Sequence, residues 1–342
     1  MIQIQENKNL LPYNTFGIAA QARYFCTITT EADLLELLAT EVYANHRYLI
    51  LGGGSNVLFV QDFDGLVIKN ELKGIREVDQ DDHTITLQVM GGEIWHDLVL
   101  YCVHHQYGGI ENLSLIPGTV GAAPIQNIGA YGVEIKEVIN QVAGIDLLTR
   151  LPRTFTNQQC EFGYRDSTFK HAWKEKFFIS SVTLTLTRNQ HHFNLRYGAL
   201  SETLHAVQPH EVSLQMISDA VIRIRQSKLP DPAVIGNAGS FFKNPTIAPD
   251  HFEELKKQYP NIPGYQSENQ QIKVPAGWLI EQCGWKGKRM GAVGVHHQQA
   301  LVIVNHGAAH GQEILDLAHR ITSSVQQQFQ IALIPEVNII SG

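Results

Sequence analysis

The chain lacks the features that mark several common protein classes. Four cysteines form no Cys-x-x-Cys pair, and 16 histidines form no His-Glu-x-x-His pattern, so we predict no metal and no thioredoxin-type site. No segment approaches the roughly 18 apolar residues that span a bilayer. The start lacks the basic and apolar regions of a signal peptide. We therefore expect a cytoplasmic protein with reduced thiols and no membrane partner.

Excess basic charge is also missing. Lys and Arg number 26 against 33 Asp and Glu, and the formal net charge is −7. A general nucleic-acid binder would carry a basic face, so we predict no nucleic-acid partner. An anionic small ligand would need local donors, because the overall field repels it. The length of 342 residues favours two or three domains.

Strand and helix patterns are mixed along the chain. They predict strands over residues 22–28, 48–51, 66–69, 84–89, 177–186 and 300–305. They predict helices over residues 31–38, capped by Thr30, and over residues 94–105 and 213–228. A last helix is predicted from the apolar stripe that runs from residue 314 to residue 325. Residues 331–340 are expected to form a closing strand interrupted by Glu336. These patterns predict a small α/β unit up to residue 69 and a mostly β region from about residue 74.

A glycine-rich turn follows the strand predicted over residues 48–51. It contains Gly52, Gly53, Gly54, Ser55 and Asn56. Glycines permit positive φ angles and close approach, so successive backbone N–H groups can converge on an anion. An ordinary tight turn is the alternative, and this segment alone does not separate the two.

A second run, residues 116–132, is rich in glycine, proline and small apolar residues. Such a long coil in a compact domain is usually functional or disordered, and its scarcity of charge argues against disorder. Backbone amides packed against a flat ligand would explain the small side chains. Two such loops suit a dinucleotide with a central pyrophosphate.

Residues 237–245 place Ser240 in a turn beside Phe241 and Phe242. Serine in that position contributes little to packing, whereas the rings could exclude water around its hydroxyl. Ser240 is therefore a candidate proton donor in a dry pocket. The alternative is an ordinary surface turn.

Further candidates are charged or aromatic. Arg165 follows Tyr164, and its guanidinium could bind a carboxylate in bidentate fashion. The alternative is a surface salt bridge. Glu336 lies in an apolar segment, where an unpaired carboxylate is costly. Lys228 ends a predicted helix, where a lysine also suits the helix dipole. Tyr197 lies in a loop, where most tyrosines only pack.

Together these motifs resemble the UDP-N-acetylenolpyruvoylglucosamine reductase family, bacterial flavoenzymes of peptidoglycan synthesis. The resemblance runs from residues 14–17 to the C-terminus. It rests on the turn at residues 52–56, the run at 116–132, residues 164–167, residues 239–245 and residues 335–337. The turn at residues 52–56 alone also suits the wider vanillyl-alcohol-oxidase-like FAD proteins.

The resemblance implies three domains. Two α+β domains form a vanillyl-alcohol-oxidase-like FAD-binding fold, the first from residues 1–72 and 330–342 and the second from residues 73–223. A substrate-binding α+β domain covers residues 224–329. The cofactors implied are FAD and NADPH, the substrate is UDP-N-acetylglucosamine enolpyruvate, and we expect a monomer.

The resemblance also implies roles for individual residues. The catalytic set is Ser240, Arg165 and Glu336. The FAD-binding set is Gly52, Gly53, Gly54, Ser55, Asn56, Pro117, Gly118, Thr119, Gly121, Ala122, Gln126, Asn127, Gly129, Ala130 and Tyr131. The substrate-binding set is Tyr164, Tyr197, Lys228, Asn244, Tyr265, Lys286 and Gln299. Tyr197 resembles the lid tyrosine of the longer form of the enzyme.

In the implied chemistry, NADPH reduces the flavin, and the reduced flavin delivers hydride to C3 of the enolpyruvyl ether. Arg165 favours the charge that develops on the carboxylate, Glu336 holds the enolate form, and Ser240 protonates C2. Two other functions are considered. One is a vanillyl-alcohol-oxidase-like oxidase of an alcohol or sugar, and the other is a non-catalytic nucleotide-sugar or FAD-binding module.

Overall fold

The computed structural model describes residues 2–266 and 270–341. The chain divides into two units, and each unit is assembled from several segments of the chain. The first unit comprises Met1–Lys8, Ala22–Gly54 and Asp64–Ser227. The second unit comprises Asn9–Gln21, Ser55–Phe63 and Lys228–Gly342. Among the described residues, no helix is both long and apolar enough to cross a membrane.

A four-stranded sheet begins the first unit. Its strands, in the order β1-β2-β5-β3, are Ile4–Asn9, Gln21–Ile28, Phe63–Asn70 and Tyr48–Leu51. Helices α1 (Glu31–Leu38) and α2 (Glu41–Asn45) connect β2 to β3. The predicted cap of α1 is confirmed, because Thr30 accepts from the backbone N–H of Asp33 and the Asp33 carboxylate accepts from that of Thr30. The leucines of α1 are buried with the apolar residues of this sheet.

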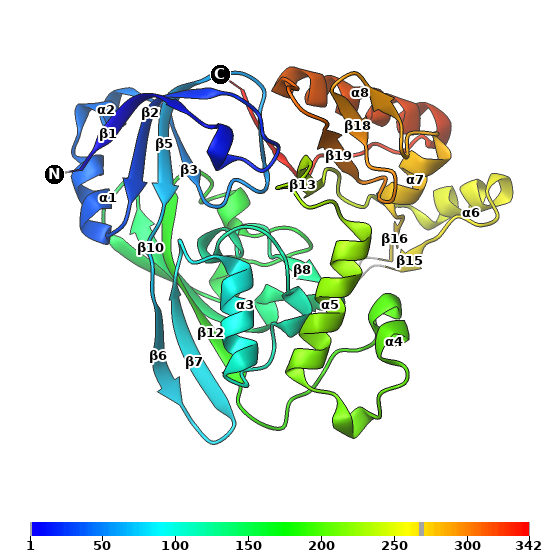
Figure 1. Ribbon diagram of the computed structural model, residues 1–342, viewed down its shortest axis with the longest axis horizontal. Coiled ribbons are helices and arrows are strands. Elements are labelled where there is room, and N and C mark those ends of the chain that lie inside the picture. Colours follow the sequence, from blue (N-terminus) through cyan, green and yellow to red (C-terminus); the bar gives the residue numbers. More distant parts are fainter. Residues whose placement is uncertain (1, 267–269, 342) are drawn as a thin grey trace. The chain divides into compact units, whose positions relative to one another are not determined.

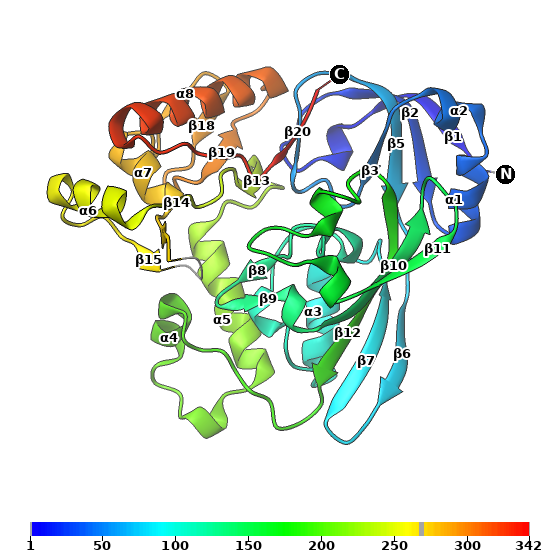
Figure 2. The same cartoon turned by 180° about the vertical axis from the view of Figure 1, so that it is seen from behind.

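A five-stranded antiparallel sheet forms the larger core of the first unit. Its strands, in the order β11-β10-β12-β7-β6, are Pro152–Thr156, Ile139–Asp146, Phe177–Thr187, Thr84–Met90 and Ile75–Gln80. Helix α3 (Trp95–His104) lies on one face of this sheet in both views (Figure 1, Figure 2). Its buried Trp95, Leu98 and Val99 pack into the same core as the alternate residues of β7 and β12.

Two more helices and several short elements complete the first unit. Helices α4 (Gly198–Leu204) and α5 (Leu214–Lys228) lie side by side (Figure 1) and share an apolar core that includes Leu200 and Val221. The short strands are β8 (Gly129–Ala130) and β9 (Val133–Glu134). The 3-10 turns of this unit are η2 (Glu111–Leu113), η3 (Val120–Ala122), η4 (Ile135–Glu137), η5 (Gln158–Cys160), η6 (Thr168–Lys170) and η7 (Pro209–Glu211).

The second unit contains three small sheets. One has the order β13-β19-β18-β17, with bounds Gly236–Ser240, Val302–Asn305, Val293–Val295 and Arg289–Met290. Another has the order β14-β16-β15, with bounds Thr246–Ile247, Ile272–Lys273 and Tyr265–Gln266. In the third, β20 (Asn338–Ile340) pairs in parallel with β4 (Val57–Phe59). The turn η1 (Leu11–Tyr13) also belongs to this unit.

Three helices surround these sheets: α6 (Pro249–Gln258), α7 (Ala276–Gln282) and α8 (Gly311–Phe329). Helix α8 packs on α7, β18 and β19 (Figure 2). The residues predicted to face the core are buried, namely Ile314, Leu317, Ala318, Ile321 and Val325. The stripe lies on one face because these residues recur at helical spacing.

Most of the predicted elements are confirmed. The strands expected over residues 84–89 and 177–186 are β7 and β12, and the helices expected over residues 94–105 and 213–228 are α3 and α5. Helix α5 ends at Lys228, just before Leu229 and Pro230, as the proline predicts. The division into three domains at residues 72, 223 and 330 stays a prediction.

Two local predictions need correction. The closing strand expected over residues 331–340 is wrong for most of its length, because β20 covers only Asn338–Ile340. Pro335 has no N–H to donate, and it forms only an isolated bridge with Phe242. The turn expected around Ser240 begins as strand β13, whose register shifts between Asn237 and Ser240.

Candidate active site

Within the first unit, residues 52–54 of the first glycine-rich loop lie against residues 118–119 of the second. A Cβ atom on Gly52 would lie 2.5 Å from the Thr119 hydroxyl oxygen, and one on Gly53 would lie 2.8 Å from the Gly118 Cα. Gly54 has a φ of +66°, which also favours glycine. Gly53 and Gly118 are 65 positions apart in the sequence. The sequence predicts each loop separately, and the structure brings them together.

The second loop is held at its start by backbone bonds. Val120 N–H donates to the Glu93 carbonyl at 2.9 Å, and Gly121 N–H donates to the Gly91 carbonyl at 2.8 Å. A Cβ on Gly121 would lie 3.0 Å from that same carbonyl oxygen. Thr119 is buried, whereas Ala122 and Gln126 are half-buried and Pro117 is exposed. The small residues of this run therefore permit close backbone packing.

Asn127 organises the later part of the loop. Its φ is +44°, a conformation that asparagine tolerates. Its side-chain N–H groups donate to the Gly163 carbonyl and the Glu134 carboxylate, both at 2.9 Å, and its side-chain oxygen accepts from Lys136 N–H at 3.1 Å. These bonds commit its side chain to the loop, and its predicted contact with a cofactor stays a prediction.

A tight hairpin follows, formed by β8 and β9. Tyr131 and Gly132 occupy its two-residue turn with φ angles of +51° and +83°. Positive φ at both central positions matches the twist of a hairpin. Gly129 and Ala130, both predicted cofactor residues, form β8 and are half-buried.

Arg165 is attached to this same loop. Its guanidinium donates to the carbonyls of Gly129 and Asn127 and lies 5.3 Å from the ring centroid of Tyr164. The Arg165 backbone has a φ of +53° within the turn closed by Gly163 and Asp166. The structure therefore joins the Tyr164–Arg165 pair to the loop at residues 127–129.

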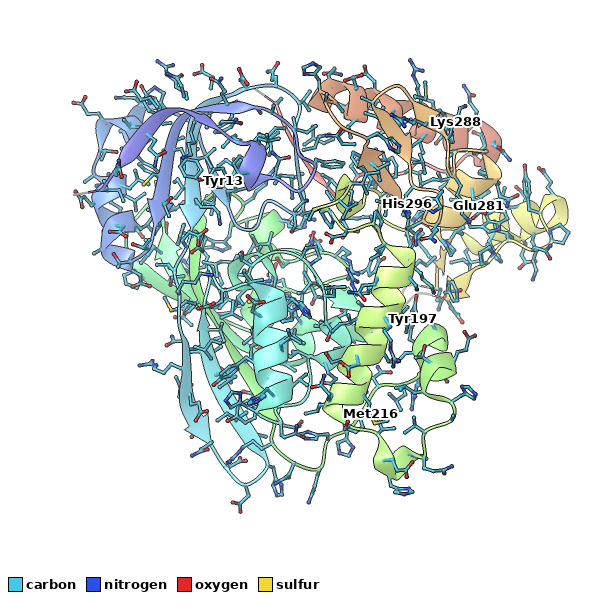
Figure 3. The ribbon with its side chains drawn as sticks, in the orientation of Figure 1. Tyr13, Tyr197, Met216, Glu281, Lys288 and His296 are labelled. Atoms are coloured by element: carbon cyan, nitrogen blue, oxygen red, sulfur yellow. The ribbon has the colours of Figure 1, made fainter. Side chains whose placement is uncertain are left out.

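Tyr197 also approaches the loop. It precedes α4, beside α5 (Figure 3), and its ring meets the edge of the Tyr131 ring at 5.2 Å between centroids. Asn194 donates to the Gly132 carbonyl at 2.7 Å, and Asn112 donates to the Asn194 carbonyl at 2.8 Å. The segment that carries Tyr197 is thus tied to the turn of the β8–β9 hairpin.

Arg225 and His96 were not predicted as site residues. Arg225, on α5, donates to the Leu115 carbonyl at 3.2 Å, and its charge interacts with the Tyr131 side chain. His96 Nδ1 accepts from the Leu115 N–H at 2.9 Å. Burial lowers the pKa of both residues, and the Arg225 charge contributes to the lowering at His96. No sequence pattern links these positions, since 110 residues separate Arg225 from Leu115.

In the second unit, backbone bonds bring Ser240 and Glu336 onto neighbouring segments. Phe241 follows Ser240; its N–H donates to the Leu301 carbonyl and its carbonyl accepts from the Glu336 N–H, both at 2.8 Å. Glu336 is half-buried, and its carbonyl accepts from the Asn56 side chain at 3.3 Å.

The expected dry pocket is not formed by the neighbouring rings. Phe241 and Phe242 are buried in the unit, with their ring centroids 5.0 Å apart, whereas Ser240 is exposed. Ser240 is the last residue of β13, and the two rings that follow it both enter the core. The two rings therefore do not shield the Ser240 hydroxyl.

The other predicted substrate residues of this unit have varied surroundings. The Asn244 side-chain oxygen accepts from Ala276 N–H at 2.9 Å, and that of Gln299 accepts from Leu301 N–H at 3.4 Å. Exposed Lys286 forms an ion pair with Glu281 at 2.9 Å. Lys228 and Tyr265 are exposed, as is Lys286. Ser55, which belongs to the predicted FAD-binding set and also lies in this unit, is half-buried.

Arg165 belongs to the first unit, whereas Ser240 and Glu336 belong to the second. The meeting of all three side chains stays a prediction. In the first unit, the glycine loops pack at distances that a Cβ would prevent, so the segments predicted to bind a dinucleotide lie together. Among residues 2–266 and 270–341, no cluster of three or more His, Cys, Asp or Glu side chains could hold a metal ion.

Comparison with known proteins agrees with this division. Residues 22–152 match the family model of an FAD binding domain. Residues 231–340 match the model of the UDP-N-acetylenolpyruvoylglucosamine reductase C-terminal domain. The predicted α+β fold, with an FAD-binding region and a distinct C-terminal domain, is confirmed.

Full-length relatives carry the same name. A UDP-N-acetylenolpyruvoylglucosamine reductase of Amoebophilus asiaticus is 52% identical over 339 residues, covering 99% of this chain and 100% of the relative. That of Flavobacterium johnsoniae is 46% identical with the same coverage. The crystal structure of the Thermus caldophilus reductase is similar in fold, with a TM-score of 0.66 and 22% identity, and covers 99% of this chain and 98% of that one.

Proposed function

Because this chain belongs to the UDP-N-acetylenolpyruvoylglucosamine reductase family, we propose that it reduces UDP-N-acetylglucosamine enolpyruvate to UDP-N-acetylmuramate with electrons from NADPH. The observation that carries this proposal is the 52% identity over 99% of the chain. The reaction would serve bacterial peptidoglycan precursor synthesis.

The paired glycine loops of the first unit would hold FAD. Gly52 and Gly53 let the first loop approach Gly118 and Thr119, so backbone N–H groups from both loops would be available to a pyrophosphate. Bound FAD supplies hydride chemistry, accepting hydride from NADPH and donating it to C3 of the enolpyruvyl group.

Three side chains would manage the charge and the proton. The Arg165 guanidinium, already fixed by two loop carbonyls, would bind the substrate carboxylate on which negative charge develops. Glu336 would hold the enolate form. The Ser240 hydroxyl would give its proton to C2, which completes the addition of hydride and proton across the double bond.

The exposure of Ser240 has a bearing on its role. A serine hydroxyl is a weak acid, so it needs a strongly basic carbanion and a source that returns its proton. Because Ser240 is exposed, solvent can reprotonate it, and Lys243 follows three residues later. The exposure of Ser240 therefore supports a mechanism in which water or an amine reprotonates its hydroxyl.

We further propose that the chain is of the longer form, with Tyr197 as the lid tyrosine. Its segment is anchored to the β8–β9 turn through Asn194 and contacts Tyr131. Tyr164, Lys228, Asn244, Tyr265, Lys286 and Gln299 would contact the nucleotide sugar. Exposed tyrosines and lysines suit stacking and phosphate binding.

Anaerobic flavin spectroscopy tests the proposal. The purified protein should be yellow, NADPH should bleach the flavin band, and UDP-N-acetylglucosamine enolpyruvate should restore it with formation of UDP-N-acetylmuramate. Bleaching without restoration by this substrate, followed by rapid recovery in oxygen, would indicate an oxidase instead. Binding without any bleaching would indicate a non-catalytic module.

A further inference from the structure

Asn112 is a buried amide that joins two segments of the first unit that are far apart in the sequence. Its side-chain nitrogen donates to the Tyr131 carbonyl at 3.0 Å and to the Asn194 carbonyl at 2.8 Å. These partners lie 19 and 82 residues away along the chain. Because an amide nitrogen has two N–H groups, Asn112 can hold the turn of the β8–β9 hairpin and the segment that leads to Tyr197 at the same time.

Packing alone does not explain an asparagine at this position. Asn112 is 1% exposed and lies between Glu111 and Leu113 in the turn η2. Its side-chain oxygen accepts no hydrogen bond from residues 2–266 or 270–341. A buried amide with an unpaired acceptor costs free energy that an apolar side chain of similar volume, such as leucine, avoids. The two bonds that the nitrogen donates are therefore what asparagine contributes and leucine cannot.

Asn194 reinforces the same connection from the other side. Its side-chain N–H donates to the Gly132 carbonyl at 2.7 Å, and its side-chain oxygen accepts from the Arg196 N–H at 3.3 Å. A Cβ atom on Gly132 would lie 3.1 Å from the Asn194 side-chain nitrogen, and Gly132 has a φ of +83°. The hairpin turn can receive Asn194 this closely because residue 132 has no side chain.

The segment held in this way connects β12 to α4 through residues 188–197, which form neither helix nor strand. It lacks the regular backbone bonds that fix such elements, so its position depends on contacts like those of Asn194. Tyr197 follows three residues later and is exposed, and its ring meets the edge of the Tyr131 ring. The place of the Tyr197 ring therefore follows from how Asn112 and Asn194 tie this segment to the hairpin.

We propose that Asn112 and Asn194 are positioning residues that hold Tyr197 in place for the substrate. This rests on the proposed function, in which Tyr197 contacts the nucleotide sugar. Without the two asparagines, the segment would have to be ordered when the substrate binds, and the entropy lost in that ordering lowers affinity.

Calorimetric titration of the FAD-loaded protein with UDP-N-acetylglucosamine enolpyruvate, without NADPH, tests the proposal. Asn194→Ala should weaken binding about 3- to 10-fold, as expected for the loss of one side-chain hydrogen bond. Asn112→Leu should weaken it about 10- to 100-fold, because two bonds are lost. Asn189→Ala is the matched control and should leave the affinity unchanged, since Asn189 is exposed in the same segment and bonds Asp82 and His83 instead.

A double-mutant cycle separates positioning from a general loss of structure. If Asn194 acts through Tyr197, Asn194→Ala should weaken binding much less in a Tyr197→Ala background than in the native protein. A general loss of structure would weaken binding by the same factor in both backgrounds.

Limited digestion with trypsin gives a readout that needs no substrate. Cleavage after Arg196, which is exposed in the tied segment, should be faster in Asn194→Ala and in Asn112→Leu. Cleavage after Arg150, which is exposed in another loop of the same unit, should be unchanged.

Equal factors in the two backgrounds, or native substrate affinity in both Asn194→Ala and Asn112→Leu, would overturn the proposal. Thermal melting and FAD content check each variant, and Asn194→Ala decides the matter if Asn112→Leu does not fold, because its bond to Gly132 is exposed. A native protein that does not bind the substrate would remove the proposed function, and the role of the two asparagines would fall with it. Native binding with equal factors would remove that role alone.

Discussion

The candidate sites of the two units differ in the kind of group that forms them. In the first unit the site consists mainly of backbone, where Gly52 and Gly53 approach Thr119 and Gly118 more closely than any other residue type allows. In the second unit it consists of side chains, with Ser240 and Lys286 exposed. A substitution in a backbone site should therefore weaken ligand binding and local packing together. A substitution in a side-chain site should remove one function while the fold persists.

The largest effect is expected in the second unit. Ser240→Ala should leave NADPH-driven flavin reduction intact and slow the oxidation of reduced flavin by substrate about 100-fold or more, because one placed proton donor is lost. Stopped-flow absorbance measures the two half-reactions separately. Ser323→Ala, at an exposed serine of α8 in the same unit, is the control. Native speed in both half-reactions of Ser240→Ala would remove Ser240 from the mechanism.

The first unit should respond differently. Gly53→Ala places a Cβ 2.8 Å from the Gly118 Cα, a backbone atom that cannot rotate away. We expect a loss of about 1–3 kcal/mol in the free energy of unfolding and weaker FAD binding in parallel. Thermal melts with and without FAD measure both.

Gly198→Ala is the matched control for this change. Nothing lies within 4 Å of a Cβ at Gly198, which begins α4, and alanine favours helix. A Gly53→Ala protein with native stability and native FAD affinity would show that the close approach of the loops is dispensable.

This contrast also explains what the sequence could predict. The glycine loops can be recognised in the sequence, because close approach of two backbones requires glycine and other small residues. Ser240 can be recognised because a hydroxyl between a glycine and two phenylalanines contributes little to packing. Arg225 was not found, because an arginine on α5 looks like any charged helix residue until Leu115 is placed beside it. Long-range placement of this kind follows from tertiary packing, which local patterns do not specify.

The errors have a similar origin. Residues 331–340 have the apolar composition of a strand, yet Pro335 interrupts the ladder, and β20 finds β4 as its partner only at Asn338–Ile340. The pocket expected around Ser240 assumed that Phe241 and Phe242 face the hydroxyl. Both rings instead enter the core, where burying them contributes more free energy than covering one serine.

A smaller effect is expected at Lys286. Lys286→Ala should raise KM for the nucleotide sugar about tenfold, a loss of about 1.4 kcal/mol, and leave kcat and Tm almost unchanged. Stability should persist because its ion pair with Glu281 is exposed, and such pairs contribute little. Lys288→Ala is the control, since that lysine is also exposed and lies 4.3 Å from the Trp285 ring. Equal KM values in the two variants would contradict the assignment of Lys286.

The smallest effect concerns pH and the first unit. The pKa of His96 is lowered, chiefly by burial, so below about pH 6.5 the unfolded chain binds a proton that the folded chain resists. The stability associated with neutral His96 is therefore present above that pH and is lost as the pH falls through the folded-state pKa. Protonation would also break the bond that Nδ1 accepts from Leu115.

His96→Asn should reduce this dependence, because the asparagine oxygen can accept from Leu115 at any pH. Melting temperatures between about pH 7.5 and about pH 5 should then fall less steeply than in the native protein. His104→Asn, at an exposed histidine of the same helix, should leave the slope unchanged. Identical slopes in His96→Asn and the native protein would mean that the acid sensitivity of the first unit arises elsewhere, and that the Leu115 backbone does not depend on a neutral imidazole.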